Sequence, residues 1–217
     1  MEKARRYKSF IISNNIRSSA NVGSLFRIAE SLDMGLILQG ITPHPKTKDD
    51  TRLPYIIKND TKKITKTAVH SIRKVEWYYF KTVDEVLDFI NTGDSAFPKD
   101  KKQSFKKYQK TIKLTNNLKR YKKTCDIKVN SKLVLEPKGI TLYTLEQGIK
   151  NAINIYSKTF KVQYPFALVV GNEVNGVEDN FIKASKQILY LPMKGSQSSI
   201  NVAVSAAVAC FHLNYSQ

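Results

Sequence analysis

Three separate segments of the chain carry polar side chains and glycines in patterns that could support a reaction. In the first, residues 21–29, Asn21 precedes a run of apolar residues at helical spacing, and Arg27 follows six positions later. Six residues rotate a helix by about 600°, so the two side chains converge only if Asn21 lies in the turn before the helix. The alternative interpretation is an ordinary surface arginine.

The second segment, residues 168–177, is an apolar run that ends at Gly171 and continues as a polar turn closed by Gly176. Open α/β sheets bind ligands beyond the carboxyl ends of their strands, and glycine lets the backbone approach closely there. Glu173 lies within this turn. It is either part of a ligand site or an exposed residue of an ordinary turn.

The third segment, residues 191–204, joins another apolar run to an alanine- and valine-rich helix through a loop of small residues. The backbone groups of such a loop can bind an adenine edge and a methionine-like chain without charged side chains. The second and third segments together predict two glycine-bearing strand ends that meet at one ligand site.

Several familiar signatures are absent from the sequence. No GxGxxG opens a helix, no GxxxxGK[ST] indicates a P-loop, and no GxSxG elbow indicates a hydrolase. The three histidines lack ligand spacing, and the two cysteines lie far apart, which argues against a zinc site or a disulfide framework. These residues are His44, His70, His212, Cys125 and Cys210. We therefore expect no metal.

The elements that must position these segments belong to an α/β fold. Strands are expected at residues 9–12, 35–40, 76–80, 166–170 and 187–191, and helices at 83–91, 144–156 and 199–213. A further helix lies between the first two strands, and Ser18, Ser19 or Asn21 could cap its start. This strand–helix–strand spacing indicates a parallel sheet. We expect a single domain over residues 1–217, with a parallel sheet flanked by helices.

The positive charge is concentrated in one part of the chain. There are 36 Lys and Arg against 18 Asp and Glu, a net of +18, and residues 98–138 alone carry a net of +11. Basic runs interleaved with aromatic residues suit phosphate neutralisation and base stacking, whereas a solvated loop is the alternative. We predict a basic insertion at about 93–138 that contacts RNA through Lys106, Lys107, Lys119, Arg120, Lys122 and Lys123.

The composition excludes a disordered chain and a membrane protein. Hydrophobic residues make up 41 % of the 217 residues and charged residues 25 %. No apolar run approaches the ~18 residues that a membrane span requires, and the N-terminus lacks a secretory apolar region. We expect a soluble, cytoplasmic protein.

In this order, the three segments resemble the motifs of the SpoU (TrmH-like) family of RNA ribose 2′-O-methyltransferases, within the SPOUT superfamily. The family's N-x-G-x-x-x-R-x-A matches residues 21–29, its G-x-E-x-x-G matches 171–176, and its I/L-P-M-x-G followed by S-L-N-V matches 191–202. The resemblance covers roughly residues 9–91 and 139–213 and leaves the basic insertion outside. Two residues depart from the pattern, Ile28 in place of threonine and Ala203 in place of serine.

The resemblance implies a C-terminal deep trefoil knot, a homodimer that completes the active site, and S-adenosyl-L-methionine as methyl donor. By position, the implied catalytic residues are Arg27, Asn21, Glu173, Ser199 and Asn201. The implied cofactor contacts are Val170, Gly171, Asn172, Leu191, Met193 and Ile200. We interpret the arginine as a phosphate-bound group that orients the ribose, because a guanidinium is not easily deprotonated.

The expected function is methylation of a ribose 2′-hydroxyl of tRNA or rRNA. The alternative is a catalytically inactive, basic RNA-binding protein that retains the fold. Retention of the polar residues of the first and third motifs favours the enzyme.

Overall fold

A parallel sheet organises the part of the chain that the computed structural model describes, residues 9–47, 50–92 and 140–215. The strands lie in the order β3-β2-β1-β6-β4-β7-β5, and every neighbouring pair is parallel. They are β1 (Phe10–Asn14), β2 (Gly35–Gln39), β3 (Trp77–Phe80), β4 (Thr141–Leu145), β5 (Ile153–Asn154), β6 (Phe166–Val170) and β7 (Gln187–Tyr190). The expected parallel α/β sheet is confirmed.

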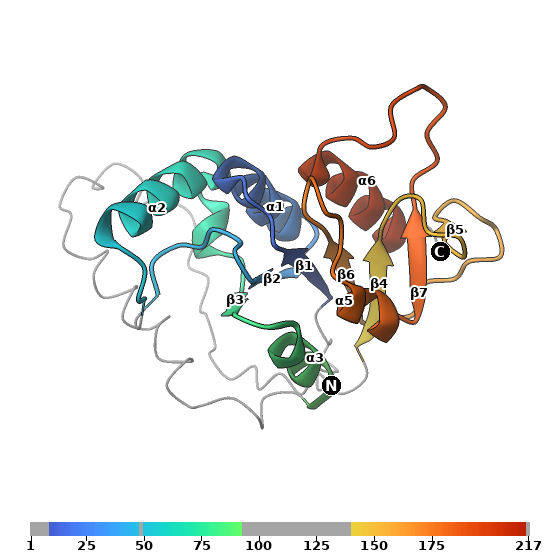
Figure 1. Cartoon of the computed structure of the whole chain (residues 1–217), viewed down its shortest axis with the longest axis horizontal. Coiled ribbons are helices and arrows are strands. Elements are labelled where there is room, and N and C mark those ends of the chain that lie inside the picture. Colours follow the sequence, from blue (N-terminus) through green and yellow to red (C-terminus); the bar gives the residue numbers. More distant parts are fainter. Residues whose placement is uncertain (1–8, 48–49, 93–139, 216–217) are drawn as a thin grey trace, which may run out of the picture.

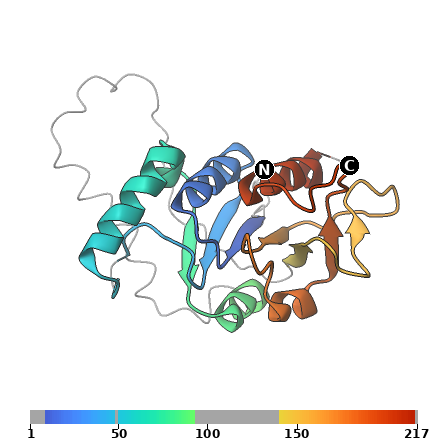
Figure 2. The same ribbon diagram turned by 45° about the horizontal axis from the view of Figure 1, so that its top comes forward.

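Helices cover both faces of this sheet, as Figures 1 and 2 show. One face packs against α1 (Ser19–Ser31), α2 (Pro54–Ala68) and α6 (Val202–Tyr215). The other face packs against α3 (Val83–Thr92) and α5 (Asp179–Ala184). A short 3₁₀ helix, η1 (Ser71–Arg73), precedes β3. The central strands β1 and β6 are buried along their whole length, as near-continuous apolar runs in a two-sided parallel sheet should be.

The helix predicted for residues 144–156 is wrong. This segment instead contains the end of β4, a turn through Gly148 at φ +75°, and the short strand β5. The β4 backbone pairs with β6 on one side and β7 on the other, and these ladders outweigh the helical spacing of the apolar residues. The C-terminal helix also begins at Val202 rather than Ser199.

Helix α1 begins directly after Ser18, one of the residues expected to cap it. The Ser18 side chain accepts a hydrogen bond from the backbone N–H of Asn21 at 3.3 Å, so Ser18 is the N-cap. Asn21 therefore lies inside the first turn of α1 and not in the turn before it. The Asn21 and Arg27 side chains were expected to converge only if Asn21 lay before the helix, so this condition is not met.

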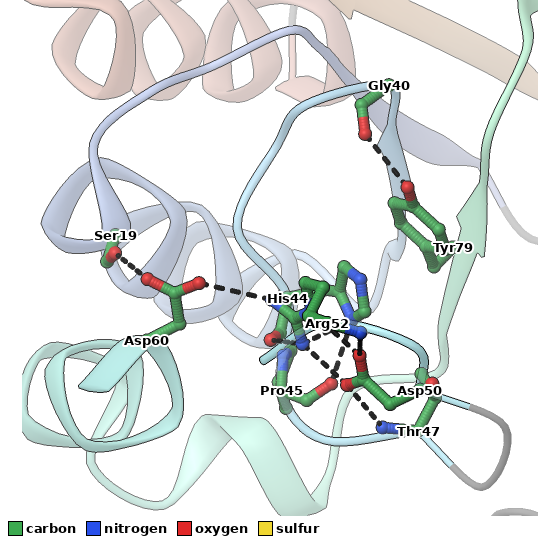
Figure 3. A network of polar contacts seen from close by, with 9 residues as sticks. All are labelled: Ser19, Gly40, His44, Pro45, Thr47, Asp50, Arg52, Asp60 and Tyr79. Carbon is green, nitrogen blue, oxygen red and sulfur yellow. Dashed lines mark hydrogen bonds and ion pairs between the residues drawn. The ribbon is translucent and has the colours of Figure 1, made fainter. Parts of the chain in front are cut away.

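Helix α2 was not predicted, and a polar network around Arg52 fastens its beginning (Figure 3). The Arg52 guanidinium donates to the Asp50 carboxylate at 2.7 Å and to the Asp60 carboxylate at 3.1 Å. Asp60 in turn accepts a hydrogen bond from Ser19 Oγ, at the start of α1, at 3.1 Å. The network thus ties α2 and the loop before it to α1.

This network has a pH-dependent consequence. Burial alone would raise the pKa of Asp50, but the hydrogen bonds and charge of Arg52 lower it to about 2. A carboxyl with a depressed folded-state pKa contributes stability above its unfolded pKa of about 4 and loses that contribution as the pH falls towards 2. Asp50→Asn should therefore lower the free energy of unfolding at pH 7 by about 1 kcal/mol, allowing for solvent screening.

Urea unfolding of Asp50→Asn and of the wild type between pH 7 and pH 2.5 checks this expectation. The difference between the two proteins should shrink as the pH falls below 4. A difference that stays constant across this range would contradict the ion-pair account.

The segment between β7 and α6, residues 191–201, makes the long excursion seen in Figure 1 before it returns to the α1 side of the sheet. The expected trefoil knot depends on how this segment threads past the 171–178 loop. The knot remains a prediction. No helix in the described ranges has the length and apolar content that a bilayer span requires.

Candidate active site

A chain of hydrogen bonds joins the three sequence motifs at one point. Asn21 Nδ2 donates to Glu173 Oε1 at 2.8 Å, and Asn201 Nδ2 donates to Asn21 Oδ1 at 3.1 Å. These residues stand 152 and 180 positions apart along the chain. Asn201 also accepts a hydrogen bond from the backbone N–H of Ala203 at 2.9 Å, so it caps the start of α6. The fold therefore gathers three of the five predicted catalytic residues.

The other two predicted catalytic residues, Arg27 and Ser199, lie outside this chain of hydrogen bonds. Both are exposed. Within the described ranges, neither side chain has a hydrogen bond or an ion pair. Arg27 is nearly two turns further along α1 than Asn21. Its guanidinium is therefore available to an anionic group that is not part of this chain's described structure.

The turn after β6 brings two backbone segments into close contact. A Cβ added to Gly171 would lie 2.4 Å from the Gly176 carbonyl carbon and 2.5 Å from the Val177 nitrogen. Gly176 itself has φ +70°, in the left-handed region that favours glycine. The second motif therefore requires its two glycines for different reasons. Gly171 allows the close approach of the backbone, and Gly176 adopts a left-handed conformation.

Two residues that the sequence analysis missed connect the second and third motifs. The Glu146 carboxylate accepts the backbone N–H of Val177 at 2.7 Å, and the Gln147 amide donates to the Leu191 carbonyl at 2.9 Å. Both residues follow β4 directly. The end of β4 thus holds the 171–178 turn with one side chain and the start of the 191–201 loop with the next.

A second brace holds the turn against β1. Glu178 Oε1 accepts hydrogen bonds from the side-chain amides of Asn14 at 2.7 Å and Asn15 at 2.5 Å. Asn172 Nδ2 donates to the Asn15 carbonyl at 2.6 Å, and its Oδ1 accepts from the backbone N–H of Val174 at 2.7 Å. The Asn172 side chain, predicted to contact a cofactor, is therefore engaged in holding the turn. The polar pair at the end of the buried strand β1, Asn14 and Asn15, was a signal in the sequence for this brace.

Four predicted cofactor contacts lie outside this turn, one at the end of β6 and three within the 191–201 loop. Val170 and Leu191 are buried, Met193 packs against the core, and Ile200 is 41 % exposed. Among the described residues, no backbone N–H from Met193 to Ile200 donates a hydrogen bond to another group. Unpaired backbone donors and acceptors beside a glycine turn suit a ligand that is recognised through its polar edges rather than through its charge.

This arrangement could position a hydroxyl and bind a ligand next to it through the ligand's polar edges. The Asn21–Glu173–Asn201 chain supplies amide and carboxylate groups, and Arg27 supplies a planar cation suited to phosphate. No group of three or more His, Cys, Asp or Glu side chains in the described ranges forms a metal site. The six predicted RNA-binding residues of the basic insertion lie outside the described residues.

A separate cavity of about 680 Å³ opens beyond the carboxyl ends of β1, β2 and β3. Its lining includes Gly40, His44, Arg52 and Tyr79, all of which are labelled in Figure 3. None of the predicted catalytic or cofactor residues lines it. The cavity is therefore distinct from the site that the three motifs form.

A family model described as the SpoU rRNA Methylase family matches residues 101–211 of the chain. The matched range covers half of the chain and includes the second and third motifs. It begins within the basic segment that the motif resemblance left outside, and it does not reach Asn21 or Arg27.

Two known proteins illustrate the likeness in sequence and in structure. The 23S rRNA (guanosine(2553)-2′-O)-methyltransferase RlmP of Bacillus subtilis is 46 % identical over 48 residues, which is 22 % of this chain and 19 % of that protein. The SpoU methyltransferase AviRb from Streptomyces viridochromogenes superposes with a TM-score of 0.60 at 18 % identity, over 97 % of this chain and 60 % of AviRb.

Two further solved structures give the same fold. AviRb in complex with the cofactor AdoMet has a TM-score of 0.59 at 17 % identity, over 99 % of this chain and 59 % of AviRb. The A. aeolicus TrmH/SpoU tRNA modifying enzyme has a TM-score of 0.57 at 15 % identity, over 97 % of this chain and 76 % of that enzyme. The chain thus spans about three fifths of the length of AviRb, and these likenesses establish the fold.

Proposed function

Because the chain belongs to the SpoU rRNA Methylase family, we propose that it transfers a methyl group from S-adenosyl-L-methionine to a ribose 2′-hydroxyl of tRNA or rRNA. The observation that carries this proposal is the hydrogen-bonded chain of Asn21, Glu173 and Asn201. It unites three motifs that are far apart in sequence, at the carboxyl edge of the sheet where α/β folds place their ligands. The 2′-O-methyltransferase activity of RlmP, the similar B. subtilis protein, agrees with this reaction class.

S-adenosyl-L-methionine is the cofactor that the residues fit. The unpaired backbone groups of residues 193–200 and the close approach at Gly171 offer polar edges and space, without a charged side chain from this loop apart from Lys194. When bound, this cofactor supplies an electrophilic methyl group on a sulfonium. The AviRb structure in complex with AdoMet has the same fold. We also propose that the 191–201 segment forms the knot of the SPOUT superfamily.

The protein's own contribution is to position the ribose and to help remove its proton. An in-line attack needs the 2′-oxygen held at a fixed distance and angle, and such positioning is worth several orders of magnitude in rate. The exposed Arg27 guanidinium would bind an RNA phosphate next to the target ribose with its planar fork. The amides of Asn21 and Asn201 and the Glu173 carboxylate would hydrogen-bond the ribose or order the loops around it. The proton leaves to the phosphate or to water.

We also propose a homodimer, because α6 exposes an apolar stripe beside the site. Ile200, Val204, Val208, Phe211 and Tyr215 follow one another at helical spacing and are 41 %, 50 %, 38 %, 44 % and 73 % exposed. The opposite side of α6 is buried in the core, so this helix has apolar residues on two opposite sides. A helix with two apolar sides is normally covered on both. A second copy that covers the stripe would also enclose Asn201, which directly follows Ile200.

Val208→Glu should convert the dimer to a monomer and abolish methyl transfer. The change places a carboxylate in the middle of the stripe, where burial of an unpaired charge is strongly unfavourable. Sedimentation equilibrium measures the mass of the variant. Tyr55→Glu, at an exposed apolar residue of α2, is the control and should leave the mass unchanged. A monomeric wild type would contradict the dimer.

Isothermal titration calorimetry with S-adenosyl-L-methionine tests the proposed function. We expect saturable binding at micromolar ligand. An absence of binding at millimolar ligand would favour the alternative, a basic RNA-binding protein that retains the fold without catalysis. The segment of residues 93–138, which is rich in lysine, remains a proposed RNA contact under both functions.

A further inference from the structure

Helix α2 carries an uncompensated basic face. Its four lysines, Lys58, Lys62, Lys63 and Lys66, are all exposed. Three of them recur every four residues, so they form one stripe along the helix. Within the described residues, none of the four side chains has a hydrogen bond or an ion pair. The one acidic residue of α2, Asp60, is already engaged by Ser19 and Arg52. This charge is therefore available to an external polyanion.

The helix is held rigidly against α1, next to the candidate active site. Ile64 and Ala68 of α2 are buried against α1. The two helices cross closely at Gly23, where an added Cβ would lie 2.6 Å from Thr67 Cβ and 2.8 Å from the Ile64 carbonyl oxygen. Gly23 belongs to the same motif as Arg27 and precedes it by one helical turn, about 6 Å. The backbone of α2, which carries the lysine stripe, is thus fixed against α1 about one helical turn from the Arg27 position.

Among the described residues, α2 and α3, which lie on opposite faces of the sheet, differ in charge. Helix α2 shares its face of the sheet with α1 and α6, the helices that bear Arg27 and are capped by Asn201. On the opposite face, α3 carries Asp84, Glu85 and Asp88 and has no lysine or arginine between Val83 and Thr92. A polyanion is attracted to the first face and repelled from the second.

We propose that the Lys58–Lys62–Lys66 stripe of α2 binds the phosphate backbone of the RNA substrate and guides the strand towards Arg27. This inference rests on the proposed function, and it adds a second RNA contact to the basic segment of residues 93–138. An RNA strand that approaches Arg27 over α2 contacts these lysines before it reaches the guanidinium. The Arg52 network holds the helix in place before RNA arrives, so little ordering is needed on binding (Figure 3).

The test compares two lysine triples of equal charge change in the full chain. Lys58→Gln/Lys62→Gln/Lys66→Gln removes the stripe, and glutamine preserves helix propensity. Lys150→Gln/Lys158→Gln/Lys161→Gln removes three exposed lysines from the connection around β5, at the opposite edge of the sheet, and is the matched control. Fluorescence anisotropy with a labelled 20-nucleotide single-stranded RNA of mixed sequence gives the affinity between 50 and 400 mM salt.

We expect the α2 triple to reduce the slope of log affinity against log salt by about 2 and the affinity at 0.15 M salt by about fifty-fold. The control triple should lose less than about threefold in affinity through general screening. Lys58→Arg/Lys62→Arg/Lys66→Arg should behave like the wild type, because it keeps the charge. If the glutamine triple does not fold, the single variants Lys58→Gln and Lys66→Gln decide the question, because each should reduce the slope by about 0.7. Equal losses in both glutamine triples, or an unchanged α2 triple, would overturn the inference.

Methyl transfer to RNA by the wild type separates this inference from the proposed function. If the wild type methylates RNA and the α2 triple binds RNA as tightly as the wild type, the inference fails and the proposed function stands. If the wild type neither binds nor methylates RNA, the proposed function fails and the inference fails with it.

Discussion

Arg27→Lys is expected to lower the rate of methyl transfer about 100-fold while leaving the affinity for S-adenosyl-L-methionine unchanged. Lysine keeps the positive charge but loses the planar fork that binds a phosphate through two parallel hydrogen bonds. A small displacement of the ribose from the attack geometry has an effect of this size. The Arg27 side chain is exposed and makes no hydrogen bond or ion pair within the described residues, so its substitution should leave the fold intact.

Single-turnover kinetics with labelled methyl donor measures the rate, and calorimetry measures the cofactor affinity. Arg73→Lys is the control, because Arg73 is also an exposed arginine and lies outside the candidate site. The control should keep full activity. A wild-type rate in Arg27→Lys would contradict the bidentate role of the guanidinium.

Gly171→Ala is expected to lower the free energy of unfolding by about 3 kcal/mol and to weaken cofactor binding strongly. The added methyl would lie 2.4 Å from the Gly176 carbonyl carbon, a contact with backbone that a rotamer change cannot relieve. Overpacking of this kind costs about 1–3 kcal/mol, and more when the obstacle is rigid. The turn is additionally held by Glu146 and by Asn172, so it cannot shift freely.

Gly195→Ala provides the matched control for this prediction. It makes the same chemical change in the other glycine-bearing loop of the site, where nothing lies within 4 Å of the added Cβ. Its free energy of unfolding should stay within about 0.5 kcal/mol of the wild type. Urea unfolding of the two variants gives the comparison, and similar stabilities would contradict the close packing at Gly171.

The sheet and the three-motif site were predictable because their signals are local. Continuous apolar runs such as Phe166–Val170 occur where a parallel strand is buried on both faces, and this strand lies at the predicted residues. The carboxyl ends of parallel strands lie at the same edge of a sheet. The polar residues that follow β6 therefore lie close to those of the first and third motifs. The residues alone predicted that the second and third segments meet, and the resemblance to the SpoU motifs added Asn21; the structure joins Asn21, Glu173 and Asn201 by hydrogen bonds.

The contribution of β4 was not predictable from its own sequence. Residues 144–156 contain apolar residues at helical spacing, whereas the pairing of β4 with β6 and β7 involves residues more than twenty positions away. Because that segment was predicted as a helix, Glu146 and Gln147 were not recognised as the side chains that join the two ligand loops. The position of Asn21 inside α1 was also missed, because Ser18, Ser19 and Asn21 were all able to cap the helix.

The role of Gly23 also became clear only in three dimensions. In the sequence it is one position of a motif, but in the fold it allows α2 to cross α1 within contact of the Ile64 carbonyl. Helix α2 lacked an apolar stripe strong enough to be predicted, because only Ile64 and Ala68 are buried. Its position depends on the Arg52 network, whose residues lie in separate parts of the chain.

The central claim is that this chain methylates a ribose 2′-oxygen of RNA, and site mapping of the product tests it most directly. The purified protein is incubated with S-adenosyl-L-methionine and with unmodified transcripts of tRNA and 23S rRNA, and 2′-O-methyl positions are then mapped by resistance of the adjacent phosphodiester to alkaline cleavage. We predict one protected position that appears with the wild type and is strongly reduced with Arg27→Lys. Methylation on a base, or no methyl transfer to either RNA by a protein that binds the cofactor, would contradict the claim.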